Sequence, residues 1–247
     1  MALRIMTVLE ARAATRQPLT LTQLVEATGL AKTTVHRMSW RLVDLGLLEH
    51  TDNGFSIGTK MLTLAYSKPV VNDIRAAEIP HLLEIQKMAG TANLAILTGG
   101  RALVIDSLFT KGDGPASAHR SGLPLHCTSI GKAIRARMDP EPRDLLLDSS
   151  LLTAATPRSL VHPAVIRRHL DRIAETGVAF SNEEFERGMI GIAAAFKVRD
   201  GNIAAIGCVG ISTNPTVARS AGLVARAAAQ LERTFDQQSV SGPLGVI

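Results

Sequence analysis

Residues 19–58 read LTLTQLVEATGLAKTTVHRMSWRLVDLGLLEHTDNGFSIG, and this stretch decides how the N-terminal part of the chain folds. Thr20 and Gln23 have the spacing of a capping box, in which two residues satisfy each other's backbone N–H groups at a helix start. Gly29 is typical of the position just past a helix end. The apolar residues between them recur at helical spacing and are Leu21, Leu24 and Val25. We therefore predict a short helix between Thr20 and Gly29.

A second helix is predicted after Leu30, with one apolar side. That side is formed by Val35, Met38, Leu42 and Leu45. Two short helices joined by a glycine turn form a helix-turn-helix, whose second helix enters the major groove of DNA. Two strand-like runs follow, at 47–50 and 55–57, and Asn53-Gly54 between them favours a hairpin, the "wing" of a winged helix.

The outward residues of the second helix decide its chemistry. They are hydrogen-bond donors suited to phosphates and base edges, with no acidic residue among them. These residues are Lys32, Thr33, Thr34, His36, Arg37 and Arg41, to which we add Thr20 and the wing residue Asn53 as expected DNA contacts. The alternative is a small helical bundle with a solvated basic face, and the wing favours DNA binding. Trp40 also lies off the apolar side, and its role stays open.

The composition fits a globular protein of two domains. The chain has 247 residues, of which 46% are hydrophobic and 20% charged, and its net charge is +5. Residues 1–68 hold eight Lys and Arg against five Asp and Glu, so the smaller segment is the more basic per residue. Neither a membrane-spanning run nor a signal-peptide core is recognisable, and two cysteines are too few for a disulfide framework. We expect a cytoplasmic protein without membrane attachment.

The remainder of the chain predicts an α+β domain. Lys68-Pro69 is the expected boundary, and a connecting helix should follow to Gly90, with Pro80 kinking it or starting a new turn. Its apolar stripe, expected to supply part of a dimer contact, is Ile74, Ala77, Leu82 and Ile85. Strands are predicted at 93–97, 102–108, 178–181, 191–198 and 203–211, with a loop at 111–115. Helices are predicted at 128–138, from about 141 to 148, at 164–176 and at 215–235. Helices and strands do not alternate in a parallel βαβ rhythm, so the sheet should be antiparallel.

Three stretches, taken together, resemble the isocitrate lyase regulator (IclR) family of bacterial transcription regulators. The first runs from Pro18 to Arg37, with Leu45-Gly46-Leu47-Leu48 after it. The second is 122–133, GLPLHCTSIGKA. The third comprises Glu183-Glu184, Gly188, 192–194 and Asp200-Gly201. They occur in the family's order and at its spacing.

This resemblance implies a winged helix-turn-helix DNA-binding domain at 1–68 and a GAF-like effector-binding domain at 69–247, with a linker helix at about 69–90. It implies a homodimer or homotetramer bound to a double-stranded DNA operator, and a small organic metabolite, commonly an acid, as effector. We expect no cofactor. It also implies a set of pocket-lining residues. These are Ser129, Ile130, Ser181, Met189, Gly191, Gly207 and Val209.

The second stretch has a chemistry that can be read without the family. Leu123 to His126 should be extended, and a helix should begin at Thr128 or Ser129. The first N–H groups of a helix lack partners and carry positive potential, so they stabilise a carboxylate. We expect a cavity with these donors, apolar walls and no buried Lys or Arg, which favours a carboxylic acid with an apolar or aromatic body. The alternative is that Thr128 and Ser129 only cap the helix.

Other chemistries receive little support. His126 and Cys127 are adjacent, and neighbours on a strand point to opposite faces, so a Cys–His nucleophilic pair is not expected. The seven histidines show no metal-binding spacing, so we predict no metal site, no catalytic residue and no enzyme activity. Two alternatives stay open beside a ligand-responsive regulator, most simply a repressor. They are a small-molecule enzyme with a helical appendage and a DNA-binding protein whose second domain only oligomerises.

Overall fold

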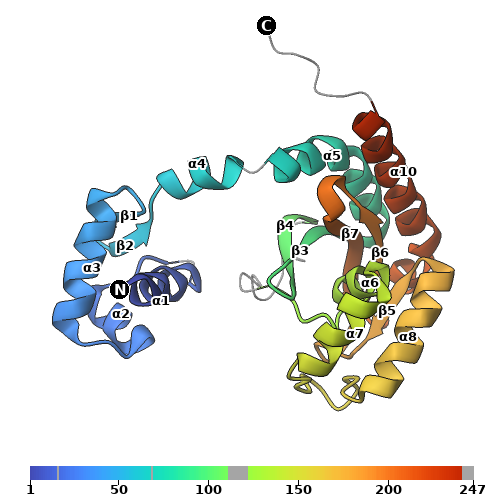
Figure 1. The fold of residues 1–247 in the computed structure, drawn as a ribbon, viewed down its shortest axis with the longest axis horizontal. Helices are drawn as coiled ribbons and strands as arrows, with labels where there is room; N and C mark the ends of the chain where they lie inside the picture. Colours follow the sequence, from blue (N-terminus) through green and yellow to red (C-terminus); the bar gives the residue numbers. More distant parts are fainter. Residues whose placement is uncertain (16, 68, 111–121, 241–247) are drawn as a thin grey trace, which may run out of the picture. The chain divides into compact units, whose positions relative to one another are not determined.

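The structure is a computed structural model that describes residues 1–15, 17–67, 69–110 and 122–240 (Figure 1). Within it the chain divides into two compact units, residues 1–72 and 73–247, each considered by itself below. The predicted loop at 111–115 lies outside the described residues. We call residues 1–72 the winged-helix unit, and we call residues 73–247 the effector unit after the domain that the resemblance implies.

The winged-helix unit contains the predicted helix-turn-helix and wing. Its elements are α1 (Ala2–Ala13), α2 (Leu21–Thr28), α3 (Lys32–Asp44), β1 (Leu48–Thr51), β2 (Gly54–Ile57) and α4 (Lys60–Tyr66). The capping box is present: Gln23 N donates to Thr20 Oγ1 at 3.3 Å, and Thr20 N donates to Gln23 Oε1 at 2.9 Å. Gly29 ends α2 in the left-handed region, with φ of 66°. Local sequence chemistry therefore sets both ends of α2, as predicted.

One apolar core holds this unit together. Its buried members come from α1, α2, α3 and the hairpin, and are Val8, Leu9, Leu19, Leu24, Val35, Met38, Leu42, Leu48 and Phe55. The prediction was wrong for Leu45, whose side chain is 52% exposed. Leu45 is the C-cap of α3, where the chain turns toward β1, so it no longer follows the helical stripe.

Helix α5 (Pro69–Ala89) continues through Pro80 as one element, so no new helix begins there. Its predicted stripe faces the interior: Ile74 and Ile85 are fully buried and Leu82 is almost so. The expectation that this stripe supplies a dimer contact is therefore wrong, because the domain's own core already covers it. The exposed large apolar side chains of α5 are instead Ile79, Leu83 and Met88.

Glu78 lies on the buried side of α5. Its side chain is fully buried and lies beside Asp106. Burial raises the pKa of Glu78 to about 8, and both the negative charge of Asp106 and a hydrogen bond with its side chain add to this shift. Asp106 itself pairs with Arg75 at 3.2 Å. Glu78 is therefore protonated at neutral pH.

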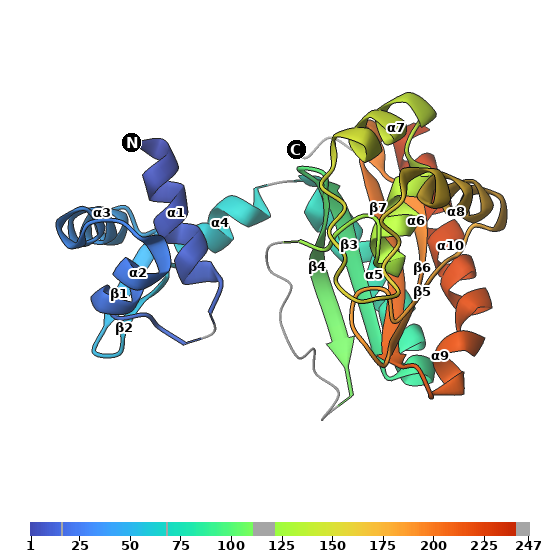
Figure 2. The same cartoon turned by 90° about the horizontal axis from the view of Figure 1, so that it is seen from below.

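The effector unit is built on a five-stranded sheet whose paired strands are all antiparallel, as predicted. The order is β4-β3-β7-β6-β5, with β4 at one edge (Figure 2). The strands are β3 (Thr91–Thr98), β4 (Arg101–Phe109), β5 (Ala179–Asn182), β6 (Met189–Lys197) and β7 (Ile203–Ile211). Small residues lie side by side on neighbouring strands, as in the pair Ala193 and Gly207. They leave room for a helix to pack closely on the face of the sheet that carries them.

Helices cover both faces of the sheet. One face packs on α6 (Ser129–Arg137), with Ala193 and Ala205 in the shared core, and α8 (Pro163–Thr176) and α7 (Pro140–Ser149) form a layer outside α6. On the other face Phe196 stacks on Phe235 of α10 (Ala221–Val240) and Asp106 pairs with Arg75 of α5. Figure 1 shows α10 running beside this sheet.

The single helix predicted at 215–235 is two helices, α9 (Pro215–Arg219) and α10. Ser220 separates them, because its N–H bonds the Val217 carbonyl three residues back and its hydroxyl donates to the Thr216 carbonyl at 2.8 Å. These bonds replace the regular helical ladder for one residue. The α+β class with an antiparallel sheet is confirmed.

Candidate functional site

The predicted DNA contacts of α3 lie on its solvent side. Lys32, Thr33, His36, Arg37 and Arg41 are exposed, and Thr34 is half-buried. Within the described residues no acidic side chain pairs with Lys32 or Arg37, and Arg41 has only a 3.9 Å contact with exposed Asp44. The face is therefore basic and available to a polyanion.

The first turn of α3 adds backbone donors to this face. Its N-cap is Ala31, which has no side-chain cap, so the leading N–H groups around Lys32 and Thr33 point out of the helix end. Such a helix start favours a phosphate. Thr20 and the wing residue Asn53 are also exposed, although the Thr20 hydroxyl is already engaged in capping α2.

Trp40 joins α3 to the wing. Its ring centroid lies 4.9 Å from that of His50 on β1 and 5.8 Å from that of Phe55 on β2. A surface pocket lies here, lined by Thr20, Leu21, His36, Trp40, His50, Asp52, Gly54 and Phe55. The indole therefore braces the hairpin against the recognition helix, which is a structural role that the sequence left open.

The pocket residues implied by the resemblance lie largely on the α6 face of the sheet. Ser181, Gly191 and Val209 stand opposite one another across β5, β6 and β7. A methyl group added at Gly191 would lie 2.6 Å from Ser129 Oγ, so the start of α6 rests directly on this row. Half-buried Met189 lies two residues before Gly191 on β6, and Gly207 lies two residues before Val209 on β7, so both are on the same face of the sheet. Ile130 is buried in the core beside this face. The structure thus brings these residues together, and their binding role stays a prediction.

The start of α6 is tightly built. Thr128 caps it, since Gly131 N donates to Thr128 Oγ1 at 3.0 Å and the Thr128 hydroxyl donates to the Pro124 carbonyl at 2.7 Å. A methyl group at Gly131 would lie 2.2 Å from that carbonyl oxygen. The expectation of an extended Leu123–His126 was wrong in its second half, because the chain turns at 125–127 to bring Pro124 against the helix.

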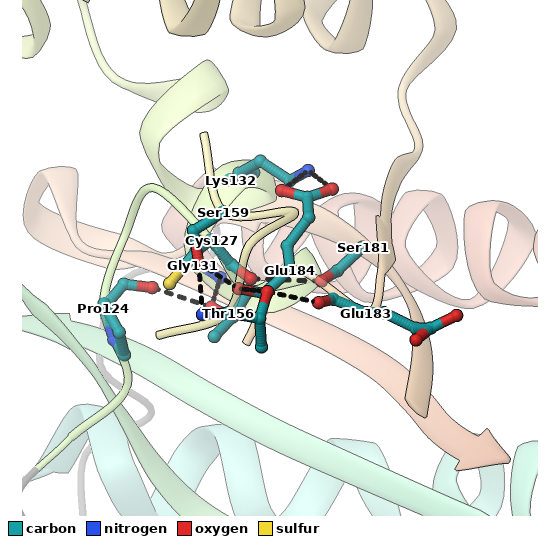
Figure 3. A network of polar contacts seen from close by, with 10 residues as sticks. Pro124, Cys127, Gly131, Lys132, Thr156, Ser159, Ser181, Glu183 and Glu184 are labelled. Atoms are coloured by element: carbon teal, nitrogen blue, oxygen red, sulfur yellow. Dashed lines mark hydrogen bonds and ion pairs between the residues drawn. The ribbon is translucent and has the colours of Figure 1, made fainter. Parts of the chain in front are cut away.

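A buried ion pair lies beside this helix start, and the sequence did not predict it. Lys132 on α6 is 1% exposed, and its Nζ lies 2.6 and 2.7 Å from the two carboxylate oxygens of Glu184 (Figure 3). The expectation of no buried Lys or Arg near this site is therefore wrong, since Lys132 and also Arg135 are buried. Burial lowers the pKa of Lys132, and the Glu184 carboxylate opposes that shift.

The backbone around Glu184 is fixed by hydroxyl groups. Ser159 donates to the Glu184 carbonyl at 2.6 Å, and Thr156 donates to the Glu183 carbonyl at 2.6 Å (Figure 3). Glu183 adopts φ of 57°, a conformation that non-glycine residues rarely accept. Its side chain compensates by accepting the Gly188 N–H and pairing with Arg158. This network orients Glu184 toward Lys132.

His126 and Cys127 do not form a nucleophilic pair. They lie in a turn rather than a strand, so the argument from alternating strand faces does not apply. His126 Nε2 instead contacts the Thr153 carbonyl at 3.0 Å, and burial lowers its pKa. Burial, aided by Glu184, raises the pKa of the Cys127 thiol to about 11. The thiol therefore stays protonated and unreactive at neutral pH.

Two other kinds of site have no candidate among the described residues. No cluster of three or more His, Cys, Asp or Glu side chains there is arranged to hold a metal ion. None of the helices there combines the length and apolar content needed to cross a membrane.

Comparison with known proteins decides the family. Residues 70–239 match the model of the "bacterial transcriptional regulator IclR C-terminal" domain, and residues 2–52 match the "IclR helix-turn-helix domain". The chain belongs to the IclR family. It is therefore a transcriptional regulator of that family with a helix-turn-helix and an effector-binding domain, as the resemblance implied.

Individual IclR-family proteins align with this chain over most of their length. The probable transcriptional regulator SauR of Cupriavidus necator is 28% identical over 198 residues, 78% of each chain. The transcriptional repressor IclR of Escherichia coli is 28% identical over 180 residues, 70% of this chain and 66% of its own. The crystal structure of an IclR homologue from Microbacterium hydrocarbonoxydans, complexed with 4-hydroxybenzoate, superposes with a TM-score of 0.81 at 24% identity, covering 95% of this chain and 98% of its own.

A sequence signal for the buried cations did exist. Residues 129–136 read SIGKAIRA, and all eight are buried. A helix whose other residues are small or apolar has no polar side on which Lys132 and Arg135 could be solvated. That composition predicts that at least one of them is enclosed.

Proposed function

We propose that this IclR-family protein is a repressor that binds an operator through α3 and the wing and leaves it when a small carboxylic acid binds the effector unit. The observation that carries the proposal is the solvent-exposed basic face of α3, with Arg37 at its centre, beside a hairpin braced by Trp40. The name of the Escherichia coli relative, a transcriptional repressor, supports the sign of regulation. Such a protein acts in the cytoplasm, where the DNA is.

The effector class is proposed from chemistry and from one relative. The expected pocket joins the start of α6 to the sheet face that carries Met189 and Val209. The Microbacterium homologue is described in complex with 4-hydroxybenzoate, which combines a carboxylate with an aromatic body. The same combination suits a helix N-terminus next to apolar walls.

The proposed assembly is a dimer or a pair of dimers. A single winged helix makes a small DNA interface, so two half-sites and two copies are expected. We place the self-association contact on the outward side of α5, where Ile79 and Leu83 are one helical turn apart and about half exposed. Leu83→Glu should then lower the sedimentation coefficient at micromolar concentration, while Leu151→Glu at a 90% exposed position should not.

A gel-shift experiment tests the proposal. The probe is DNA flanking the protein's own gene, because such regulators often control neighbouring genes, and the ligand is 4-hydroxybenzoate. We expect a salt-sensitive complex that the acid dissolves, together with a melting temperature that rises with acid concentration. Ser129→Leu should abolish both acid effects and keep DNA binding.

Each other outcome selects an alternative. A DNA complex that no small molecule affects would favour a second domain that only oligomerises. Absence of a salt-dependent complex with DNA would favour the alternative of a small-molecule enzyme with a helical appendage. Stabilisation only by amines or sugars, or an acid effect that survives Ser129→Leu, would contradict the proposed effector class and site.

A further inference from the structure

Helix α6 encloses a second cation that has no counter-charge among the described residues. Lys132 and Arg135 are 1% and 2% exposed, and they lie one helical turn apart. Lys132 is neutralised by Glu184. Arg135 has one long contact, from Nη2 to Ser150 Oγ at 3.4 Å, while its Nε and Nη1 atoms have no hydrogen-bond partner among the described residues. A guanidinium carries five N–H donors, so most of them are unused.

The aspartates of the neighbouring helices α7 and α8 are engaged elsewhere. Asp144 and Asp171 pair with Arg143, and Asp148 pairs with Arg167. These carboxylates are 38 to 60% exposed, so they belong to the surface. In the part of the chain that the structure describes, none of them forms an ion pair with Arg135.

Arg135 nevertheless keeps its charge. Burial lowers its pKa only to about 10, which leaves the guanidinium protonated at neutral pH. Enclosing such a charge without a counter-ion carries a large desolvation penalty. A water molecule can accept one of its hydrogen bonds but cannot neutralise the charge. The environment of Arg135 therefore calls for an anion.

We propose that Arg135 is a binding site for a compact monovalent carboxylate, separate from the effector pocket expected at the start of α6. One carboxylate neutralises one guanidinium, and its two oxygens match the planar N–H donors of arginine. A phosphate dianion would leave an excess negative charge in the core.

The placement on α6 separates this site from the expected effector pocket. Ser129 rests on Gly191 of the sheet, whereas Arg135 reaches Ser150 at the end of α7. Six residues of helix separate the two by about 9 Å along the axis and by about 120° around it. His126 contacts Thr153, three residues beyond Ser150, and Arg135 is among the charges that lower its pKa. A bound carboxylate would thus tie α6 to the segment at 150–153.

Thermal unfolding with sodium acetate as the probe tests the site. Four proteins are compared: the wild type, Arg135→Met, Ser129→Leu and the control Arg137→Met, which removes an exposed arginine of the same helix. Because general salt effects are shared by all four, the difference between variants is the readout. We expect a saturable rise in melting temperature for the wild type, Ser129→Leu and Arg137→Met, and its loss in Arg135→Met. Without acetate, Arg135→Met should be at least as stable as the wild type, because a buried unpaired charge has been removed.

The remaining outcomes overturn the proposal. An equal acetate response in Arg135→Met places any binding elsewhere. A response to chloride or phosphate as strong as that to acetate contradicts a carboxylate site. If Arg135→Met does not fold, the ¹⁵N–¹H resonance of the wild-type Arg135 Nε, assigned with Arg135→Lys, decides instead. Acetate should shift that resonance, and an unshifted resonance refutes the site.

Discussion

In the winged-helix unit the basic side chains of α3 point to solvent, whereas in the effector unit α6 encloses Lys132 and Arg135. The exposed charges cost little during folding and remain available to a partner. The enclosed charges must be compensated inside the protein or by a ligand, since desolvation of an unpaired ion is expensive. Charge changes in the first unit should therefore alter binding, and charge changes in the second should alter stability.

The largest effect is expected from breaking the buried pair. Glu184→Gln leaves the Lys132 ammonium enclosed without a carboxylate, which should lower the free energy of unfolding by about 3–5 kcal/mol. Urea unfolding measures this loss. Asp148→Asn, which breaks the exposed contact with Arg167, is the matched control and should cost less than about 1 kcal/mol. Equal losses in the two variants would show that burial does not distinguish the pairs.

The next effect depends on pH and concerns Glu78. Its folded pKa of about 8 lies above the ordinary 4.5, so between these values the native state holds a proton that the unfolded state has released. The free energy of unfolding should thus fall as pH rises from 5 to 8, by up to about 1.4 kcal/mol per unit. Glu78→Gln should remove that slope, as measured by urea unfolding across this range. Glu84→Gln, at an exposed position on α5, should keep the wild-type slope.

A smaller effect is expected on the exposed side of the comparison. Arg37→Ala should weaken operator binding by about 1–3 kcal/mol if Arg37 reads a base, and should leave stability nearly unchanged. Fluorescence anisotropy at several salt concentrations measures both the affinity and its salt dependence. Arg172→Ala removes an equal charge from an exposed position of the effector unit and serves as control. Unchanged DNA affinity in Arg37→Ala would remove this residue from the interface.

The smallest effect concerns Asp44, which contacts Arg41 at 3.9 Å with both side chains largely exposed. Asp44→Asn removes a negative charge from the helix that we propose faces DNA, so operator binding should tighten by less than about 0.5 kcal/mol. Stability should change by no more than that. Weaker DNA binding in this variant would instead indicate that Asp44 holds Arg41 in the position needed to bind DNA.

Elements that depend on residues close together in the sequence were predicted more accurately than contacts between distant residues. The capping box of Thr20 and Gln23, the stop at Gly29 and the hairpin depend on residues a few positions apart, and all three were predicted. Leu45 and Ser220 were missed because a chain turn and a hydroxyl bond interrupt a regular helical pattern there. Local patterns describe elements well and their exact ends less well.

The candidate site in the effector unit was harder to predict from the sequence. Lys132 and Glu184 are 52 residues apart, and no local spacing connects them. The row of Ser181, Gly191 and Val209 was named through family resemblance, since its members meet only once the sheet register is set. The composition of α6 predicts that a cation is enclosed, but the surroundings of Arg135 depend on how α8 packs on α6 and where α7 ends, which the sequence of one helix does not contain.

Trp40 has a practical consequence. It is the single tryptophan of the chain, and its indole lies against the wing. Intrinsic tryptophan emission therefore comes from the winged-helix unit alone, while far-ultraviolet circular dichroism records the helices of both units. Following one denaturant titration by the two signals would reveal whether the units lose structure together or in sequence. The wild-type protein carries this optical probe without any label, at the place where α3 meets the wing.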